Sequence, residues 1–210
     1  STVSSDSASA SGDSEGDADP RADWPSKLTF GAVPAENAQS IEDYVTPQII
    51  ADELGIEIDF IQAADYAGVI EGTIAEEVDI ASFGGFSYVI ATGAGADLDV
   101  AGLWASDTPD GYGDYRSYLI TQVDSDVNSV EDLRGKKVCF VDPGSTSGFL
   151  FPSALLLAAD IDPTETSTDI EATFAGGHDA SALAVANGDC DAGFAYDTMV
   201  TEQLIDPGDI

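Results

Sequence analysis

The fold is decided by the stretch Val138-Cys139-Phe140-Val141-Asp142-Pro143-Gly144-Ser145-Thr146-Ser147-Gly148-Phe149-Leu150. A short run of β-branched and aromatic residues stops at a Pro-Gly break, and three hydroxyl residues follow it. After them comes an apolar segment, 149–159, with helical character. This order predicts a strand, a tight loop and the N-terminus of a helix.

The hydroxyl loop, by which we mean Ser145, Thr146 and Ser147, lies where a small anion can be held. The first turn of a helix has backbone N–H groups without partners and carries the positive end of the helix dipole. Hydroxyl donors added to these amides make a site for an oxyanion. The alternative is an ordinary N-cap, for which one Ser or Thr is enough. Three in a row exceed that need, and both interpretations stay open for this segment alone.

Charge is the unusual property of this chain of 210 residues, because 40 acidic residues stand against 6 basic ones and the net charge is −34. A surface this acidic repels nucleic acid and anionic lipid, so we expect neither as a partner. Acidic residues occur in every segment, which favours a halophilic protein over an acidic interaction tail. At ~1 M salt the Debye length is only ~3 Å, and the self-repulsion is screened.

Three features bear on the compartment. Residues 1–26 lack apolar periodicity and predict a flexible acidic leader, either a tether to a membrane anchor or an unstructured tail. No apolar run approaches the ~20 residues that span a bilayer, and no signal peptide is recognisable. Cys139 and Cys190 each open a predicted strand, so a disulfide and two separate buried thiols both stay open.

From Lys27 onward, predicted strands alternate with predicted helices, which is typical of parallel sheets covered by helices. The strands are expected at 28–33, 57–62, 79–83, 100–105, 115–123, 137–142, 170–174 and 191–195. The helices are expected at 40–54, after Asp65, at 87–92, 129–133, 149–159 and 179–186, and from Thr198 onward. Ligands of such sheets bind beyond the carboxyl ends of the strands. The hydroxyl loop lies at one such end.

Four segments at strand ends together resemble the phosphate-, phosphite- and phosphonate-binding proteins of ABC importers. They are Asp65-Tyr66-Ala67-Gly68-Val69-Ile70-Glu71, Asp79-Ile80-Ala81-Ser82-Phe83-Gly84-Gly85-Phe86-Ser87-Tyr88, Val141-Asp142-Pro143-Gly144-Ser145-Thr146-Ser147-Gly148 and Ala175-Gly176-Gly177-His178-Asp179. The resemblance covers nearly all of residues 27–198. It implies an α/β, two-lobed, periplasmic binding protein-like fold with mainly parallel sheets flanked by helices. Such a protein closes on an oxyanion and delivers it to a membrane permease.

The resemblance also assigns ligand contacts. It gives the hydroxyl loop the phosphorus-bound oxygens, and it gives further contacts to two tyrosines, the histidine of the Gly-His segment and a polar residue near the end of a strand in the second lobe. The implied ligand-binding residues are Tyr66, Tyr115, Ser145, Thr146, Ser147, His178 and Asp197.

The chain is expected to divide into an acidic leader over 1–26, a first lobe over 27–117, a second lobe over 118–197 and the start of a return segment over 198–210. Members of the family re-enter the first lobe and carry an Ile-Pro-x-Asp-Pro segment. This segment does not occur before Ile210. We therefore expect a fragment or a shortened protein, in which the C-terminal return to the first lobe is missing.

The chemistry of the expected site relies on uncharged donors, because no Lys or Arg lies in the hydroxyl loop. Hydrogen bonds to charged groups give ~1.5–3 kcal/mol each and micromolar binding needs ~8 kcal/mol, so five or six neutral donors are enough. No cofactor is expected. One histidine and two distant cysteines do not make a zinc site, and no Gly-Lys-Ser/Thr sequence forms a P-loop.

The alternative from a different class of function is a hydrolase that acts on a phosphate or carboxylic ester through the hydroxyl loop and His178. The loop Gly144-Ser145-Thr146-Ser147-Gly148 is similar to a nucleophile elbow, Gly-x-Ser-x-Gly, but its central residue is Thr146. The preferred hypothesis is a monomeric, extracellular or lipid-anchored receptor for a phosphorus oxyanion, with an ABC permease as its partner. It would touch the membrane only through an N-terminal lipid anchor.

Overall fold

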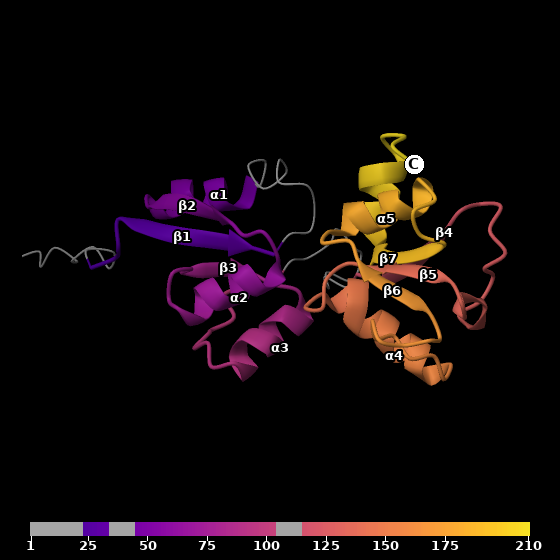
Figure 1. The fold of residues 1–210 in the computed structure, drawn as a ribbon. Coiled ribbons are helices and arrows are strands. Elements are labelled where there is room, and N and C mark those ends of the chain that lie inside the picture. Colours follow the sequence, from indigo (N-terminus) through magenta and orange to yellow (C-terminus); the bar gives the residue numbers. More distant parts are fainter. Residues whose placement is uncertain (1–22, 34–44, 104–114) are drawn as a thin grey trace, which may run out of the picture.

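The computed structural model describes residues 23–33, 45–103 and 115–210, with only the backbone described for 45–47 and 62. The chain forms two sheets that lie side by side, one built from the indigo N-terminal segments and one from the orange and yellow C-terminal segments (Figure 1). The expected α/β class, with two sheets flanked by helices, is confirmed. The limits predicted for the lobes stay predictions, and most of the predicted leader lies outside the described residues.

The first sheet contains three parallel strands in the order β2-β1-β3. They are β1 (Lys27–Ala32), β2 (Glu57–Gln62) and β3 (Ile80–Ser82). The helices that belong with this sheet are α1 (Val45–Leu54), α2 (Tyr66–Ile74) and α3 (Gly85–Gly93). Helices α2 and α3 pack together through Ile70 and Ala91, both of which are buried.

The second sheet has the order β4-β7-β5-β6. Its strands are β4 (Ser117–Thr121), β5 (Lys137–Phe140), β6 (Glu171–Phe174) and β7 (Ala192–Tyr196). β5 runs parallel to β6 and β7, whereas β4 is antiparallel to β7. The core lies over β5, where Phe140 is fully buried and stacks on Phe194 at 5.7 Å between ring centroids.

The helical segments of the second lobe follow its strands. They are a 3₁₀ turn η1 (Glu131–Leu133), a π-helical turn η2 (Thr146–Leu150), α4 (Phe151–Ala158), α5 (His178–Ala186) and a π-helical segment η3 (Met199–Ile205). Helices α3 and η2 bring the two lobes into contact. In the described parts of the chain, no helix has both the length and the apolarity that crossing a membrane requires.

A disulfide joins Cys139 on β5 to Cys190, the second residue before β7, so the bonded alternative is the one realised. Both cysteines are almost completely buried, and they pack against Val185 of α5. The bond closes a loop with a sequence separation of 51 residues. Because β5 and β7 are neighbouring strands, it joins the two central strands of the second sheet.

Two of the predicted strands differ most from the structure, whereas the helix predicted at 129–133 is only the 3₁₀ turn η1 and the strand predicted at 137–142 ends at Phe140. The strand predicted at 100–105 is wrong over 100–103, where the chain has no regular structure, and its last two residues lie outside the described part. The long strand predicted at 115–123 is β4, which has five residues, because the chain turns at Gln122 with a bond from the Ser125 amide to the Gln122 carbonyl.

Candidate functional site

The helical segment after β5 starts with the π-helical turn η2, which begins inside the hydroxyl loop at Thr146. Ser145 caps this turn, since its Oγ accepts the Gly148 amide at 3.0 Å and its carbonyl accepts the Leu150 amide at 2.9 Å. Gly148 is required here, because a Cβ on it would lie 2.2 Å from Val141 Cγ2. The wider turn therefore depends on the glycine, and it places Ser145 over the end of β5.

The side chain of Thr146 reaches the first lobe. Its Oγ1 accepts the backbone amide of Phe86 at 2.8 Å, in the first turn of α3. The same oxygen would lie 2.8 Å from a Cβ on Gly84, and Tyr115 Oη would lie 3.5 Å from that Cβ. The bare backbone of Gly84 thus lets the loop of one lobe and a tyrosine approach the helix of the other.

Ser87 adds a second bond between the lobes. Its hydroxyl is fully buried and donates to the Gly144 carbonyl at 3.0 Å. Gly144 packs on Tyr66 as well, because a Cβ on Gly144 would lie 3.3 Å from Tyr66 Cβ. Residues of both lobes are therefore in direct contact at the hydroxyl loop.

His178 lies at the centre of the site, at the first turn of α5. Its Nε2 lies 3.3 Å from Tyr66 Oη of the first lobe and 3.3 Å from Ser145 Oγ of the second. Its Nδ1 lies 3.2 Å from the Tyr196 amide. The ring is 4% exposed, and this burial lowers the pKa of His178 to about 3. The imidazole is therefore neutral at physiological pH.

Asp142 supports the same junction from the end of β5. Its carboxylate accepts the Gly144 amide at 2.7 Å and also a hydrogen bond from the Tyr66 backbone. Burial raises the pKa of Asp142, and these two amides act in the opposite direction. The residue thus bridges a loop of the second lobe and the start of α2 in the first.

The structure treats the seven predicted site residues differently. Tyr66, Ser145 and His178 are in direct contact, and Thr146 and Tyr115 converge on Gly84. Ser147 is 2% exposed, and its carbonyl accepts the Ser117 hydroxyl at 2.6 Å. The Asp197 carboxylate accepts the Thr198 amide at 3.1 Å, and Asp197 follows Tyr196, whose ring packs on His178.

Sequence reasoning did not single out three residues that the structure places at the site. Ser87 and Asp142 connect the lobes, and Tyr196 contacts both His178 and Tyr115 through its ring. Ser87 could have been found, since it follows Gly84-Gly85 at a strand end. Tyr196 gave no such signal, because it looks like an ordinary strand aromatic.

Cationic side chains do not contribute to these contacts. Among the described residues, Lys27, Arg134 and Lys136 form ion pairs with carboxylates, and none of the three lies at the carboxyl end of a strand. No group of three or more His, Cys, Asp or Glu side chains in the described residues could hold a metal ion. The donors that the site presents are hydroxyls, an imidazole and backbone amides, all of which are uncharged, and the carboxylate of Asp142 accepts backbone amides.

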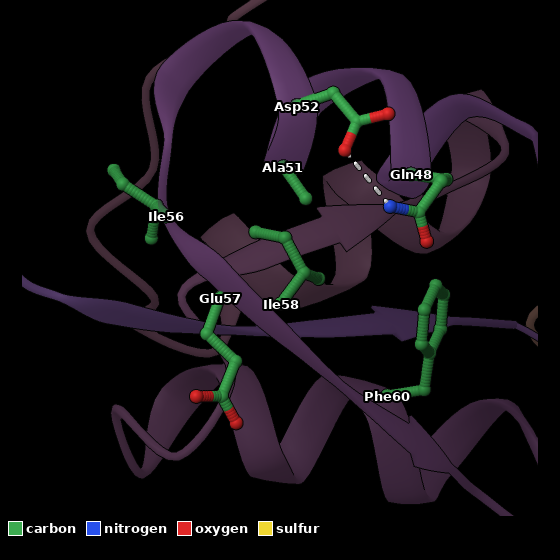
Figure 2. Close-up of a pocket in the computed structure, with 7 residues that line it drawn as sticks. All are labelled: Gln48, Ala51, Asp52, Ile56, Glu57, Ile58 and Phe60. Atoms are coloured by element: carbon green, nitrogen blue, oxygen red, sulfur yellow. Dashed lines mark hydrogen bonds between the residues drawn. The ribbon is translucent and has the colours of Figure 1, made fainter.

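A separate hollow of about 330 Å³ lies in the first lobe between α1 and β2. Figure 2 shows the residues that line it, which are Gln48, Ala51, Asp52, Ile56, Glu57, Ile58 and Phe60. The amide of Gln48 donates to Asp52 at 3.1 Å, and Glu57 adds a second carboxylate. Two carboxylates repel an anion, so this hollow does not suit an oxyanion.

Two α/β lobes that face each other through hydroxyls and helix N-termini at their strand ends define a periplasmic-type solute-binding protein. A family model described as "ABC transporter, phosphonate, periplasmic substrate-binding protein" matches residues 30–210. The chain belongs to this family, as the motifs in the sequence predicted.

Two curated relatives agree with this assignment. Phosphate-import protein PhnD of Mycolicibacterium smegmatis is 48% identical over 194 residues, which are 89% of this chain and 60% of that protein. The phosphonates-binding periplasmic protein of Escherichia coli is 35% identical over 166 residues, which are 76% of this chain and 47% of that protein. The chain thus spans about half to 60% of the length of these relatives.

Solved structures agree on the fold. PhnD1 from Prochlorococcus marinus, in complex with methylphosphonate, gives a TM-score of 0.72 at 23% identity, over 86% of this chain and 66% of that one. A binding protein component of an ABC phosphonate transporter from Pseudomonas aeruginosa gives 0.69 at 27% identity, over 84% and 61%. The relatives are substrate-binding proteins and not enzymes, so the hydrolase alternative has no support.

Proposed function

We propose that this chain forms the ligand-binding region of an ABC importer's receptor for a small phosphorus oxyanion, namely phosphonate, phosphite or phosphate. The proposed ligand lies between the lobes, at the tips of β5 and β7 and the N-termini of α3 and α5. Its oxygens accept hydrogen bonds from the hydroxyl loop, Tyr66, Tyr115 and His178, with Asp197 near the rim.

One observation carries this proposal. Tyr66 of the first lobe and Ser145 of the second both lie 3.3 Å from the same nitrogen of His178, although they are far apart in the sequence. Three neutral polar side chains, each less than 5% exposed, converge at the junction of two lobes. These groups already contact one another, and the oxygen of an anion between the lobes would be a stronger acceptor for their donors than a neutral hydroxyl is.

The strength of such a site is sufficient without a cation. A hydrogen bond to a charged group contributes ~1.5–3 kcal/mol, and micromolar affinity corresponds to ~8 kcal/mol. Four side-chain donors together with the amides at the start of α3 reach this value. The amide of Phe86, now bonded to Thr146 Oγ1, is one of these donors.

The names of two relatives support a role in import and a location outside the cytoplasm. A phosphate-import protein and a phosphonates-binding periplasmic protein are both related to this chain. We propose an ABC permease as the partner and the outer face of the cell membrane as the location, with a monomer held by an N-terminal lipid anchor. The net charge of −34 supports a working environment of high salt.

Calorimetry with methylphosphonate, phosphite and phosphate at ~1 M salt, where surface charges are screened, tests the proposal directly. Ser145→Ala and Thr146→Ala should each weaken binding by roughly 1–3 kcal/mol. Ser153→Ala is the matched control, because its buried hydroxyl lies on neighbouring α4 and has no hydrogen-bond partner. Unchanged affinity in both loop variants, measured on folded protein, would remove the hydroxyl loop from the site.

A further inference from the structure

The two nitrogens of His178 have different partners, and one of these partners fixes the tautomer. Nδ1 lies 3.2 Å from the backbone nitrogen of Tyr196. A backbone amide can only donate, so Nδ1 must offer its lone pair and cannot carry a proton. In a neutral imidazole, the proton then resides on Nε2.

The Nε2–H group points at the junction of the lobes. Tyr66 Oη and Ser145 Oγ both lie 3.3 Å from Nε2, and Ser145 Oγ already accepts the Gly148 amide at 3.0 Å. These contacts are long for hydrogen bonds of this kind, so the Nε2–H donor is only weakly engaged by either hydroxyl. A ligand oxygen placed between the two hydroxyls would be a better acceptor.

The position of Tyr196 is fixed by contacts of its ring and of its phenol oxygen, so its backbone amide can orient His178. Its ring packs edge-on against the imidazole at 4.7 Å and lies 6.5 Å from the ring of Tyr115. Its phenol oxygen contacts the side-chain amide of Gln203 on η3, at 3.2 Å from the amide nitrogen and 3.4 Å from the amide oxygen. The amide that faces Nδ1 is therefore anchored by a strand on one side and a helical segment on the other.

The titratable groups around the imidazole come from four elements. Tyr66 of α2 and Tyr196 of β7 contact the ring, Asp179 follows His178 on α5, and Asp142 lies in the loop after β5, where it accepts the Tyr66 backbone amide. Asp179 is buried, and Asp142 uses its carboxylate on backbone amides. Neither carboxylate is hydrogen-bonded to the imidazole among the contacts of the described residues, so no ion pair there favours a charged histidine.

We propose that the backbone amide of Tyr196 fixes His178 as an uncharged Nε2–H donor, so that the bound ligand meets a directed dipole at this position and not a cation. Tyr196 is then a positioning residue, since it acts through His178. The ligand part of this inference rests on the proposed function, whereas the tautomer and the charge can be measured without any ligand.

The experiment uses the fact that the chain contains a single histidine. Long-range ¹H–¹⁵N spectra of the labelled protein report the tautomer, and a coupling across the hydrogen bond identifies the Tyr196 amide as the donor to Nδ1. We expect the neutral Nε2–H form to persist when the pH falls from about 7 to about 5, because burial disfavours the charged ring. An Nδ1–H tautomer, or a protonated ring in this range, would overturn the inference.

Two amide variants of His178 extend the test to the ligand. In His178→Gln the amide nitrogen can take the place of Nε2, whereas in His178→Asn it can only take the place of Nδ1. With methylphosphonate as the probe, we expect glutamine to retain most of the affinity and asparagine to lose roughly ten- to hundredfold, the effect of one donor to an anion. Equal losses in the two variants would contradict a donor at Nε2.

The pH profile supplies the readout that a purely structural role would not give. Wild-type protein and His178→Gln should show parallel dependence of methylphosphonate affinity on pH, because the ligand's own titration is common to both. An affinity that rises in the wild type alone as the pH falls would mean that His178 gains a proton and would refute the uncharged donor. If wild-type protein binds none of the three oxyanions while the spectra show the Nε2–H form, the proposed function fails and the tautomer assignment stands.

Discussion

Removal of the Cys139–Cys190 disulfide should destabilise the second lobe by about 4 kcal/mol. In the chain-entropy model the effect depends on loop length, ~3 kcal/mol for 15 residues and ~4.7 kcal/mol for 100, and the sequence separation here is 51 residues. The closed loop contains the hydroxyl loop and His178, which are the main contributions of this lobe to the proposed site. Opening it should therefore also weaken binding, by letting β5 and β7 move apart.

Denaturant unfolding of Cys139→Ala/Cys190→Ala, of reduced wild-type protein and of oxidised wild-type protein separates the causes. Both cysteines are buried, so the double variant loses packing as well as the cross-link, whereas the reduced protein loses only the cross-link. The reduced protein and the double variant should both lose about 4 kcal/mol of unfolding free energy, and the double variant should be less stable still. A loss below ~1 kcal/mol in the reduced protein would show that residual structure already constrains the unfolded chain and would refute the entropic reasoning.

Three further predictions follow from the described contacts. Gly148→Ala should destabilise the lobe by ~1–3 kcal/mol and should weaken oxyanion binding, because a Cβ there would lie 2.2 Å from Val141 Cγ2 and 2.8 Å from Ser145 Oγ. Thermal unfolding and calorimetry check it, and wild-type values for both would contradict the close approach. The pKa of His178 lies near 3 in the folded protein and near ~6.5 when unfolded, so stability is complete above ~6.5 and falls as the pH drops towards 3. Urea titrations at a series of pH values should show that the free energy of unfolding falls more in the wild type than in His178→Gln. An equal dependence on pH in the two proteins would be evidence against a buried neutral ring. The net charge of −34 should make the free energy of unfolding rise steadily from ~0.01 M to ~1 M salt, as the Debye length falls from ~30 Å to ~3 Å. A midpoint of unfolding that does not change with salt would argue against this self-repulsion.

Local chemistry in the sequence predicted much of the fold. The strand at Glu57–Gln62 has the predicted bounds, and Asp65 caps α2 by accepting the Gly68 amide at 2.8 Å. Both depend on residues close together in the chain, where period and capping are readable. The antiparallel direction of β4 depends on its pairing with β7, a contact between distant segments. No local pattern encodes that direction.

The proposed site, like the fold, was predictable only where residues close together in the chain determine it. The hydroxyl loop could be predicted because Pro143-Gly144 and three hydroxyl residues have a clear local meaning. The π-helical turn could not, since it depends on Gly148 fitting against Val141 across the turn. The role of Tyr196 was equally hidden, because the part that contacts His178 Nδ1 is a backbone amide, which every residue but proline possesses.

The absence of cations from the described site contacts agrees with the acidity of the whole chain. A cationic side chain helps an anion mainly by long-range attraction, and at ~1 M salt that attraction reaches only ~3 Å. A hydrogen bond acts at contact, where no salt ion fits between donor and acceptor, so the dipoles of Ser145, Thr146 and His178 keep their effect. A protein that carries a charge of −34 would therefore lose little by binding its ligand through neutral donors. It also keeps selectivity, because the positions of the donors, and not the sign of the charge alone, decide which anion fits.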